Sequence, residues 1–165
     1  MVYKSDTLLL QGILENELNS SVMEIENISV HIKNLSKEEW SRLFALIPII
    51  ESAENFIESG GFIEDKEYPS SLMITPIIES KVVLDFESIM YELELVIPFN
   101  WSKWDKGRYI VNKGKYCNLN TITLLKILTA FIRNNRFCDG ALSAKFEDRT
   151  IEKILKELKK NIERK

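Results

Sequence analysis

Residues 120–135 read NTITLLKILTAFIRNN, and this stretch decides the fold. Asn120 is a residue whose side chain can accept a hydrogen bond from a free amide at the start of a helix. The apolar residues that follow recur at helical spacing and form a broad face, made by Leu124, Leu125, Ile127, Leu128, Phe131 and Ile132. We therefore predict a helix that begins after Asn120, ends near Asn135 and buries one face in a mostly helical domain.

Further helices are predicted on both sides of this one. Asp139 is a candidate cap for a short helix, and a final amphipathic helix follows with Ile151, Ile154, Leu155, Leu158 and Ile162 on one face. Upstream, Ser36 and Glu39 form a capping box, so a helix should begin near Lys37. Pro48 should kink or divide that helix, and Gly60 and Gly61 should end it. Helical spacing resumes near residue 78, with Val82, Val83, Phe86, Ile89, Met90 and Leu93 in one stripe.

The strand signals are weaker and lie mainly near the N-terminus. Ile28, Val30 and Ile32 alternate with polar residues, which is typical of a strand that buries one face. Residues 7–18 fit either a helix or a strand, and we favour a strand. Residues 62–77 are interpreted as a mobile linker with at most one short strand. The expected fold is mostly α (α+β), with about five helices, residues 1–35 as a β-containing extension packed on the core and residues 36–165 as the helical domain.

Length and composition favour one ordinary globular domain. The chain has 165 residues, of which 45% are hydrophobic and 28% charged. Its uncharged apolar runs are shorter than the roughly 20 residues of a membrane span, and the first residues do not resemble a signal peptide. Only two cysteines occur, Cys117 and Cys138, too few for a disulfide framework. We expect a cytoplasmic protein that does not contact a membrane.

The net charge of −3 conceals a division along the chain. Residues 1–99 contain 6 Lys or Arg and 18 Asp or Glu, whereas residues 100–165 contain 16 and 7. The two parts therefore carry −12 and +9. They could neutralise each other, or the basic part could bind an anionic partner. We favour neutralisation and expect no nucleic-acid partner, because glutamates interrupt the basic residues.

No pattern of known chemistry is present. His31 is the single histidine, and its position in a strand pattern favours a structural role over a catalytic one. A metal site would need His31, Cys117 and Cys138 from three unrelated segments, and no glycine-rich phosphate loop occurs. We therefore assign no catalytic residue, no metal and no cofactor.

Two short segments contain the candidate binding residues. Trp101 and Trp104 share one side of a turn, where they could cap a core or stack on a planar ligand. Arg133 and Arg136 end the helix after it, where they could stabilise the helix dipole and pair with Asp139, or bind an anion. Because one helix separates the segments, they could meet, and an arginine could then stack on an indole.

Cys138 lies in the second segment and has two interpretations. Its thiol could be activated by the two arginines and by the start of the next helix. Alternatively, Phe137 and Cys138 could fill the gap between two helices as apolar plugs, because free cysteine is commonly buried. We favour the plug.

The two segments with the candidate binding residues also resemble a known protein family. VIPFNWSKWDKG (96–107) and ITLLKILTAFIRNNRFCDGALSAKFEDRTIEKILKEL (122–158) resemble a bacterial family, the domain of unknown function numbered 6508, over about residues 36–160. The matching residues are Pro98, Phe99, Trp101, Trp104, Arg133, Arg136, Phe137, Cys138 and Gly140. Asn100 replaces the family's usual aspartate and Asp139 its glutamate, so a role that needs a carboxylate at position 100 is in doubt. The family has no known activity, so the resemblance implies a fold and motif residues but no reaction.

Two functional hypotheses follow. The preferred one is a non-enzymatic interaction module that binds a protein or another macromolecule through the basic C-terminal part, with homo-oligomerisation left open. The alternative is an enzyme or binder of a small ligand or anion that uses Arg133, Arg136, Cys138 and Asp139 beside Trp101 and Trp104. A concave pocket at these residues would favour the alternative.

Overall fold

This computed structural model describes residues 25–68 and 71–164, which fall into two units, residues 1–36 and residues 37–165. In the first unit, residues 25–34 are helical. The strand predicted around Ile28, Val30 and Ile32 is therefore wrong, and His31 lies on a helix. Ile25, Ile28 and Ile32 also recur at helical spacing, so this short stretch fits both periods. The prediction for residues 7–18 lies outside the described residues.

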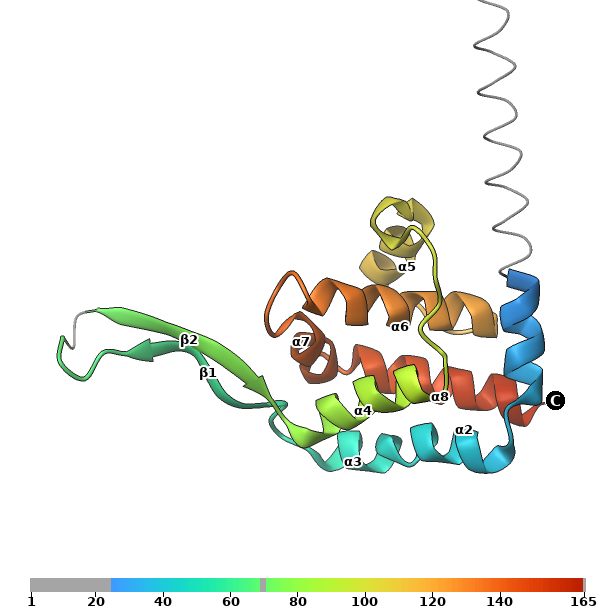
Figure 1. The fold of residues 1–165 in the computed structure, drawn as a ribbon, viewed down its shortest axis with the longest axis horizontal. Helices are drawn as coiled ribbons and strands as arrows, with labels where there is room; N and C mark the ends of the chain where they lie inside the picture. The colour runs from blue at the N-terminus through green and yellow to red at the C-terminus, as the bar shows by residue number, and fades with distance from the viewer. Residues whose placement is uncertain (1–24, 69–70, 165) are drawn as a thin grey trace, which may run out of the picture. The chain divides into compact units, whose positions relative to one another are not determined.

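The second unit is a body of helices from which a two-stranded antiparallel ribbon extends (Figure 1). The mostly α class with a small β element is confirmed, but the strands lie in the middle of the chain. The ribbon consists of β1 (Ile57–Glu64) and β2 (Leu72–Glu79). The helices are α2 (Lys37–Phe44), α3 (Leu46–Ser52), α4 (Lys81–Glu92), the 3₁₀ helix η1 (Trp101–Lys103), α5 (Asp105–Lys113), α6 (Thr121–Asn135), α7 (Ala141–Glu147) and α8 (Thr150–Glu163).

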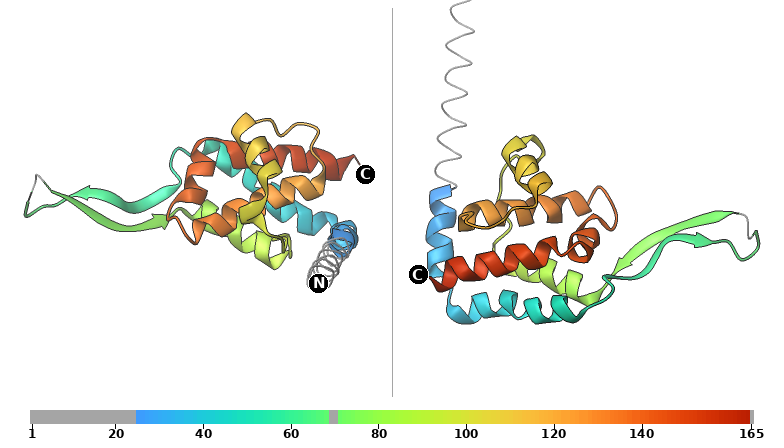
Figure 2. Two further views of the ribbon diagram at one scale, coloured as in Figure 1. Left: turned by 90° about the horizontal axis from the view of Figure 1, so that it is seen from above. Right: turned by 180° about the vertical axis from the view of Figure 1, so that it is seen from behind.

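The core of the helical body is built around α6, as its sequence predicts. Asn120 caps the helix, since its Oδ1 accepts a hydrogen bond from the Thr123 amide at 2.8 Å. Helices α5, α7 and α8 and the 3₁₀ helix η1 all contact α6 (Figure 2). Its side chains with no exposed surface are Leu124, Leu125, Ile127, Leu128, Thr129 and Ile132. The short helices are thus held by a shared apolar interior, because helices of 7 to 9 residues are marginal by themselves.

Thr129 is the polar member of this buried set. Its Oγ1 accepts a hydrogen bond from the Ile97 amide at 2.9 Å. Ile97 is 2% exposed and lies in the segment that leads from α4 to η1. Without the Thr129 hydroxyl, the buried Ile97 amide would lose its hydrogen-bond acceptor. This bond therefore fixes the path of the chain just before the tryptophan turn.

The region before the ribbon follows the sequence prediction in part. A helix begins at Lys37 as expected, and the chain divides at Ala45 into α2 and α3, with Pro48 in the first turns of α3. However, α3 ends at Ser52, so the prediction that Gly60 and Gly61 terminate a helix is wrong. Both glycines lie within β1.

The ribbon, which we call the arm (residues 57–79), occupies the stretch interpreted as a linker, so that interpretation is wrong. Phe62 pairs with Ile74, and Glu64 pairs with Leu72. The pairing shifts between Ile57 and Gly61, where Gly60 has a φ of +99°. A Cβ at Gly60 would lie 1.9 Å from the Pro76 carbonyl oxygen, so only glycine fits this irregularity.

The acidic and basic parts of the chain meet between α3 and α8. Lys156 Nζ lies 2.6 Å from Glu51 Oε1, and both side chains are partly exposed. The guanidinium of Arg149 donates to the carbonyl oxygens of Ile50 and Ala53, the latter at 3.1 Å. These contacts join the C-terminal helix to the acidic N-terminal part of the unit.

The Thr129–Ile97 bond gives a first prediction. Thr129→Val keeps the shape of the side chain but removes the acceptor, so the free energy of unfolding should fall by about 1–3 kcal/mol. Urea denaturation measures the change. Thr123→Val on the same helix is the control and should change stability by less than about 0.5 kcal/mol. Equal effects of the two substitutions would contradict the role given to the buried hydroxyl.

Candidate functional site

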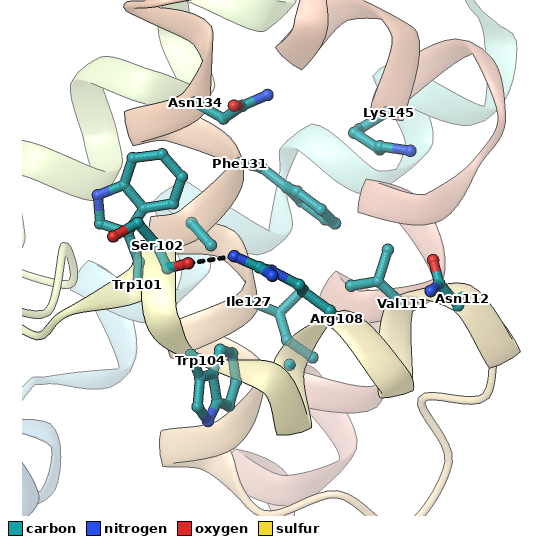
Figure 3. Close-up of a pocket in the computed structure, with 12 residues that line it drawn as sticks. Trp101, Ser102, Trp104, Arg108, Val111, Asn112, Ile127, Phe131, Asn134 and Lys145 are labelled. Carbon is teal, nitrogen blue, oxygen red and sulfur yellow. Dashed lines mark hydrogen bonds between the residues drawn. The ribbon is translucent and has the colours of Figure 1, made fainter.

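A pocket of about 370 Å³ lies between η1, α5, α6 and α7 (Figure 3). The tryptophan turn forms one wall, α6 forms the floor, and α7 contributes Lys145. The lining residues are Trp101, Ser102, Trp104, Gly107, Arg108, Val111, Asn112, Ile127, Ala130, Phe131, Asn134 and Lys145. The volume lies in the range of small-molecule sites.

The aromatic wall depends on close packing of Trp104 against α5. Gly107 is buried, and a Cβ on it would lie 2.0 Å from Trp104 Cε3. Glycine therefore lets the indole lie directly on the helix backbone. Phe99 packs edge-on against Trp104 with ring centroids 5.4 Å apart, and Lys126 Nζ lies 5.9 Å from the centroid of Trp104. The indole is thus held on several sides.

Two cations reach the pocket, and both already have partners. Arg108 donates from Nη2 to the Ser102 carbonyl oxygen, as Figure 3 shows, and its Nη1 lies 3.6 Å from Asp105. Lys145 Nζ lies 3.3 Å from Asp148 and 5.6 Å from the centroid of the Phe131 ring. A guanidinium has five N–H donors and an ammonium three, so both groups can bind a further acceptor.

The turn and the junction meet, through Trp101 and Phe137, whose ring centroids are 6.2 Å apart. Of the predicted binding residues, Trp101 and Trp104 line the pocket. Arg136 stacks on Tyr91 of α4, with its Cζ 5.7 Å from the ring centroid and a 2.6 Å hydrogen bond to the hydroxyl. Arg136 therefore stacks on a tyrosine, whereas we expected an arginine to stack on an indole.

The remaining junction residues do not converge on the pocket. Arg133 is half-buried on α6, and Asp139 is exposed. Gly140, with a φ of +78°, occupies the cap position of α7 that we assigned to Asp139. Phe137 is 81% exposed and Cys138 is also exposed, so the plug interpretation is wrong.

The polar half of the pocket was not predicted from the sequence, because we predicted no helix directly after the tryptophan turn. The segment that follows this turn is α5. Trp104, Arg108 and Val111 are spaced by four and three residues, a helical pattern that could have placed Arg108 beside the indole. Nothing in the local sequence relates Lys145 to this site, because α7 reaches it through tertiary packing.

A second candidate surface is one face of the arm. The paired residues Phe62 and Ile74 are 74% and 73% exposed, and Leu72, two residues along on the same face, is 70% exposed. The arm extends away from the helices beyond its base (Figure 2). These large exposed apolar side chains make this face of the arm a candidate interaction surface.

The base of this arm is held by polar contacts to α6 and α7. The carboxylate of Glu79 accepts hydrogen bonds from Ser143 Oγ at 2.9 Å and from Asn135 Nδ2 at 3.2 Å. Asn135 Oδ1 in turn accepts from the Leu142 amide at 2.9 Å. A Cβ on Gly140 would lie 2.7 Å from Ile77 Cδ1. Residues of the junction between α6 and α7 therefore anchor the arm.

The charge of Glu79 also affects the pKa of Glu87, a residue of α4. Burial raises the pKa of Glu87 on α4, and the carboxylate of Glu79 raises it further, while Arg136 lowers it. A carboxyl group with a raised pKa in the folded state favours folding most when it is protonated. Arg136, at the end of α6, thus stabilises the charged form of Glu87 and opposes the other two effects.

Residues 35–164 match the family described as "Family of unknown function (DUF6508)". The chain belongs to this family. No curated protein and no solved structure matches the chain. In residues 25–68 and 71–164, no helix is long and apolar enough to cross a membrane, and no group of three or more His, Cys, Asp or Glu could hold a metal ion.

The tight contact at Gly107 gives a second prediction. Gly107→Ala should displace the Trp104 indole, so its side-chain N–H resonance should shift. Unfolding free energy should fall by about 1–3 kcal/mol despite the higher helix propensity of alanine. Lys113→Ala, at an exposed position of α5 outside the pocket, is the control and should leave the Trp104 resonance in place. A stabilising Gly107→Ala with an unshifted resonance would contradict this packing.

The raised pKa of Glu87 gives a third prediction. In the wild-type protein, this residue's contribution to stability should be full below pH 4.5, the ordinary pKa of glutamate, and decrease as the pH rises through its higher folded-state pKa. Glu87→Gln should therefore gain stability relative to wild type between pH 4 and 7, measured by urea denaturation. Arg136→Gln should lose stability over the same range. A pH-independent difference between Glu87→Gln and wild type would refute the assignment.

Proposed function

We propose that the chain is a non-enzymatic protein-interaction module whose arm docks on a second copy of the chain. The exposed apolar face of the arm carries this proposal. A two-stranded ribbon is marginal in water unless a further strand or another surface covers it. Burying side chains such as Phe62, Leu72 and Ile74 contributes about 1.5–3 kcal/mol each, so a partner would gain most by covering this face.

Charge indicates what kind of surface the arm fits. Outside its anchored base residue, the arm carries four acidic residues against one lysine: Glu58, Glu64, Asp65, Glu67 and Lys66. Asp65 Oδ1 accepts a hydrogen bond from the Glu67 amide at 2.8 Å, which orders the acidic tip. Phosphates would repel such an arm, so a nucleic-acid partner is disfavoured. A basic protein surface with apolar groups fits it.

The chain contains a surface of this kind on the outer side of α5. Lys106, Tyr109 and Lys113 share one face of the helix, and Tyr109 is 64% exposed. Lys113 Nζ lies 5.6 Å from the centroid of the Tyr109 ring. Residues 100–119 carry five basic residues and one acidic residue, in accord with the basic C-terminal contact we expected. These three side chains are separate from the residues that line the pocket.

Sedimentation velocity of the full chain at 1–200 µM tests this proposal. Wild-type protein should associate in low salt and dissociate as salt is raised, because opposite charges meet. Phe62→Ser and Ile74→Ser should each shift the equilibrium toward monomer by at least about tenfold. Leu84→Ser, which removes a side chain 51% exposed on α4, is the matched control and should not.

Charge exchange identifies the contact surface. Lys106→Glu with Lys113→Glu should give monomers, and so should Glu64→Lys with Glu67→Lys. Combining all four changes in one chain should restore association, because the complementary signs are then reversed on both surfaces. Lys115→Glu with Lys153→Glu is the control for net charge. A wild-type chain that stays monomeric up to 200 µM at low salt would overturn the proposal, as would association unaffected by either pair of reversals.

A further inference from the structure

The pocket between η1, α5, α6 and α7 carries a second inference, independent of the docking surface. Among the described residues that line it, none is acidic, whereas Arg108 and Lys145 are cationic. Asp105 and Asp148, the carboxylate partners of these cations, are not among the lining residues. Asp105 is 90% exposed and solvent screens its charge. The interior of the pocket therefore favours an anion.

The walls favour a planar group. Trp101 and Trp104 come from one turn, and Phe131 faces the same space from α6 (Figure 3). Aromatic rings bind planar apolar groups by offset or edge-on stacking. Protein contacts already support both indoles: Gly107 lets the Trp104 ring lie directly on α5, and the ring centroids of Phe137 and Trp101 are 6.2 Å apart. A preformed aromatic wall loses little entropy on binding.

The polar groups lie where they can bind a small acidic group on that planar ligand. Arg108 extends across the pocket toward the tryptophan turn, and Lys145 approaches from the α7 side (Figure 3). The side chain of Lys145 is 31% exposed, so much of it is removed from water. The amides of Asn112 and Asn134 also line the pocket and can donate to an oxygen.

We propose that this pocket binds a small aromatic carboxylate of one or two rings. The ring would stack between the tryptophans and Phe131, and the carboxylate would accept hydrogen bonds from Arg108 and Lys145. A volume of about 370 Å³ accommodates such a ligand. Trp101 and Trp104 were predicted as binding residues from the sequence, whereas Arg108 and Lys145 were not.

The chain supplies an internal control for a binding experiment, because it has three tryptophans. Trp40 is 3% exposed and lies on α2, outside this pocket. Titrating the full chain with indole-3-acetate should shift the indole N–H resonances of Trp101 and Trp104 in a ¹⁵N spectrum and leave that of Trp40 in place. Indole-3-ethanol has the same ring without the charge and should bind at least about tenfold more weakly.

Variants separate the carboxylate contact from general effects. Arg108→Gln and Lys145→Gln should each raise the Kd for indole-3-acetate about tenfold, whereas Lys115→Gln, outside the pocket, should not. Repeating the titration in the Phe62→Ser chain excludes a contribution from self-association. Shifts absent at 2 mM with both indole-3-acetate and benzoate would overturn the inference. Equal binding of indole-3-ethanol, or shifts that include Trp40, would overturn it too.

Discussion

Burial of α6 is the interaction on which the rest of the second unit depends. Six of its fifteen residues have their side chains fully or almost fully shielded from water, and the elements that form the pocket all contact it. Helices of seven to nine residues, such as α5 and α7, gain their stability from such packing. Thr129 adds a polar bond inside this interior and directs the chain from α4 toward the tryptophan turn. The pocket exists because three short elements pack on one long apolar helix.

The same helix also holds the arm. The last residue of α6, Asn135, reaches both Glu79 at the base of β2 and the Leu142 amide at the start of α7. The residues from Arg133 to Gly140 thus have a structural role: Arg136 binds Tyr91, Phe137 contacts Trp101, and Gly140 gives room to Ile77. The family motif at this junction is therefore explained in good part by the need to join the arm, α4 and the tryptophan turn.

Periodicity predicted the elements whose packing is local in sequence. Asn120 and the apolar face of α6 identified the central helix, and the stripes from Val82 and Ile151 identified α4 and α8. The arm was missed because its apolar residues face water and its glycines and prolines are typical of a linker. The N-terminal strand was predicted wrongly because three alternating residues cannot distinguish the two periods.

Only the aromatic part of the candidate site was predicted from the sequence. Aromatic residues at i and i+3 identified Trp101 and Trp104, but Lys145 reaches them from a helix whose placement no local pattern gives. The exposure of Cys138 likewise depends on tertiary packing and could not be predicted from the local sequence. The apolar and acidic residues of the arm can be read from the sequence. Only the strand pairing shows that Phe62, Ile74 and Leu72 lie on one face together with Glu64.

The central claim is that the arm of one copy contacts α5 of another, and cross-linking of mixed isotopes tests it most directly. Equal amounts of ¹⁴N and ¹⁵N protein would be mixed, treated with a short amine-reactive cross-linker and analysed by mass spectrometry. The account predicts links from Lys66 at the tip of the arm to Lys106 or Lys113, including peptides with one light and one heavy partner. Links from Lys66 that never combine light and heavy chains, or that avoid α5, would contradict it.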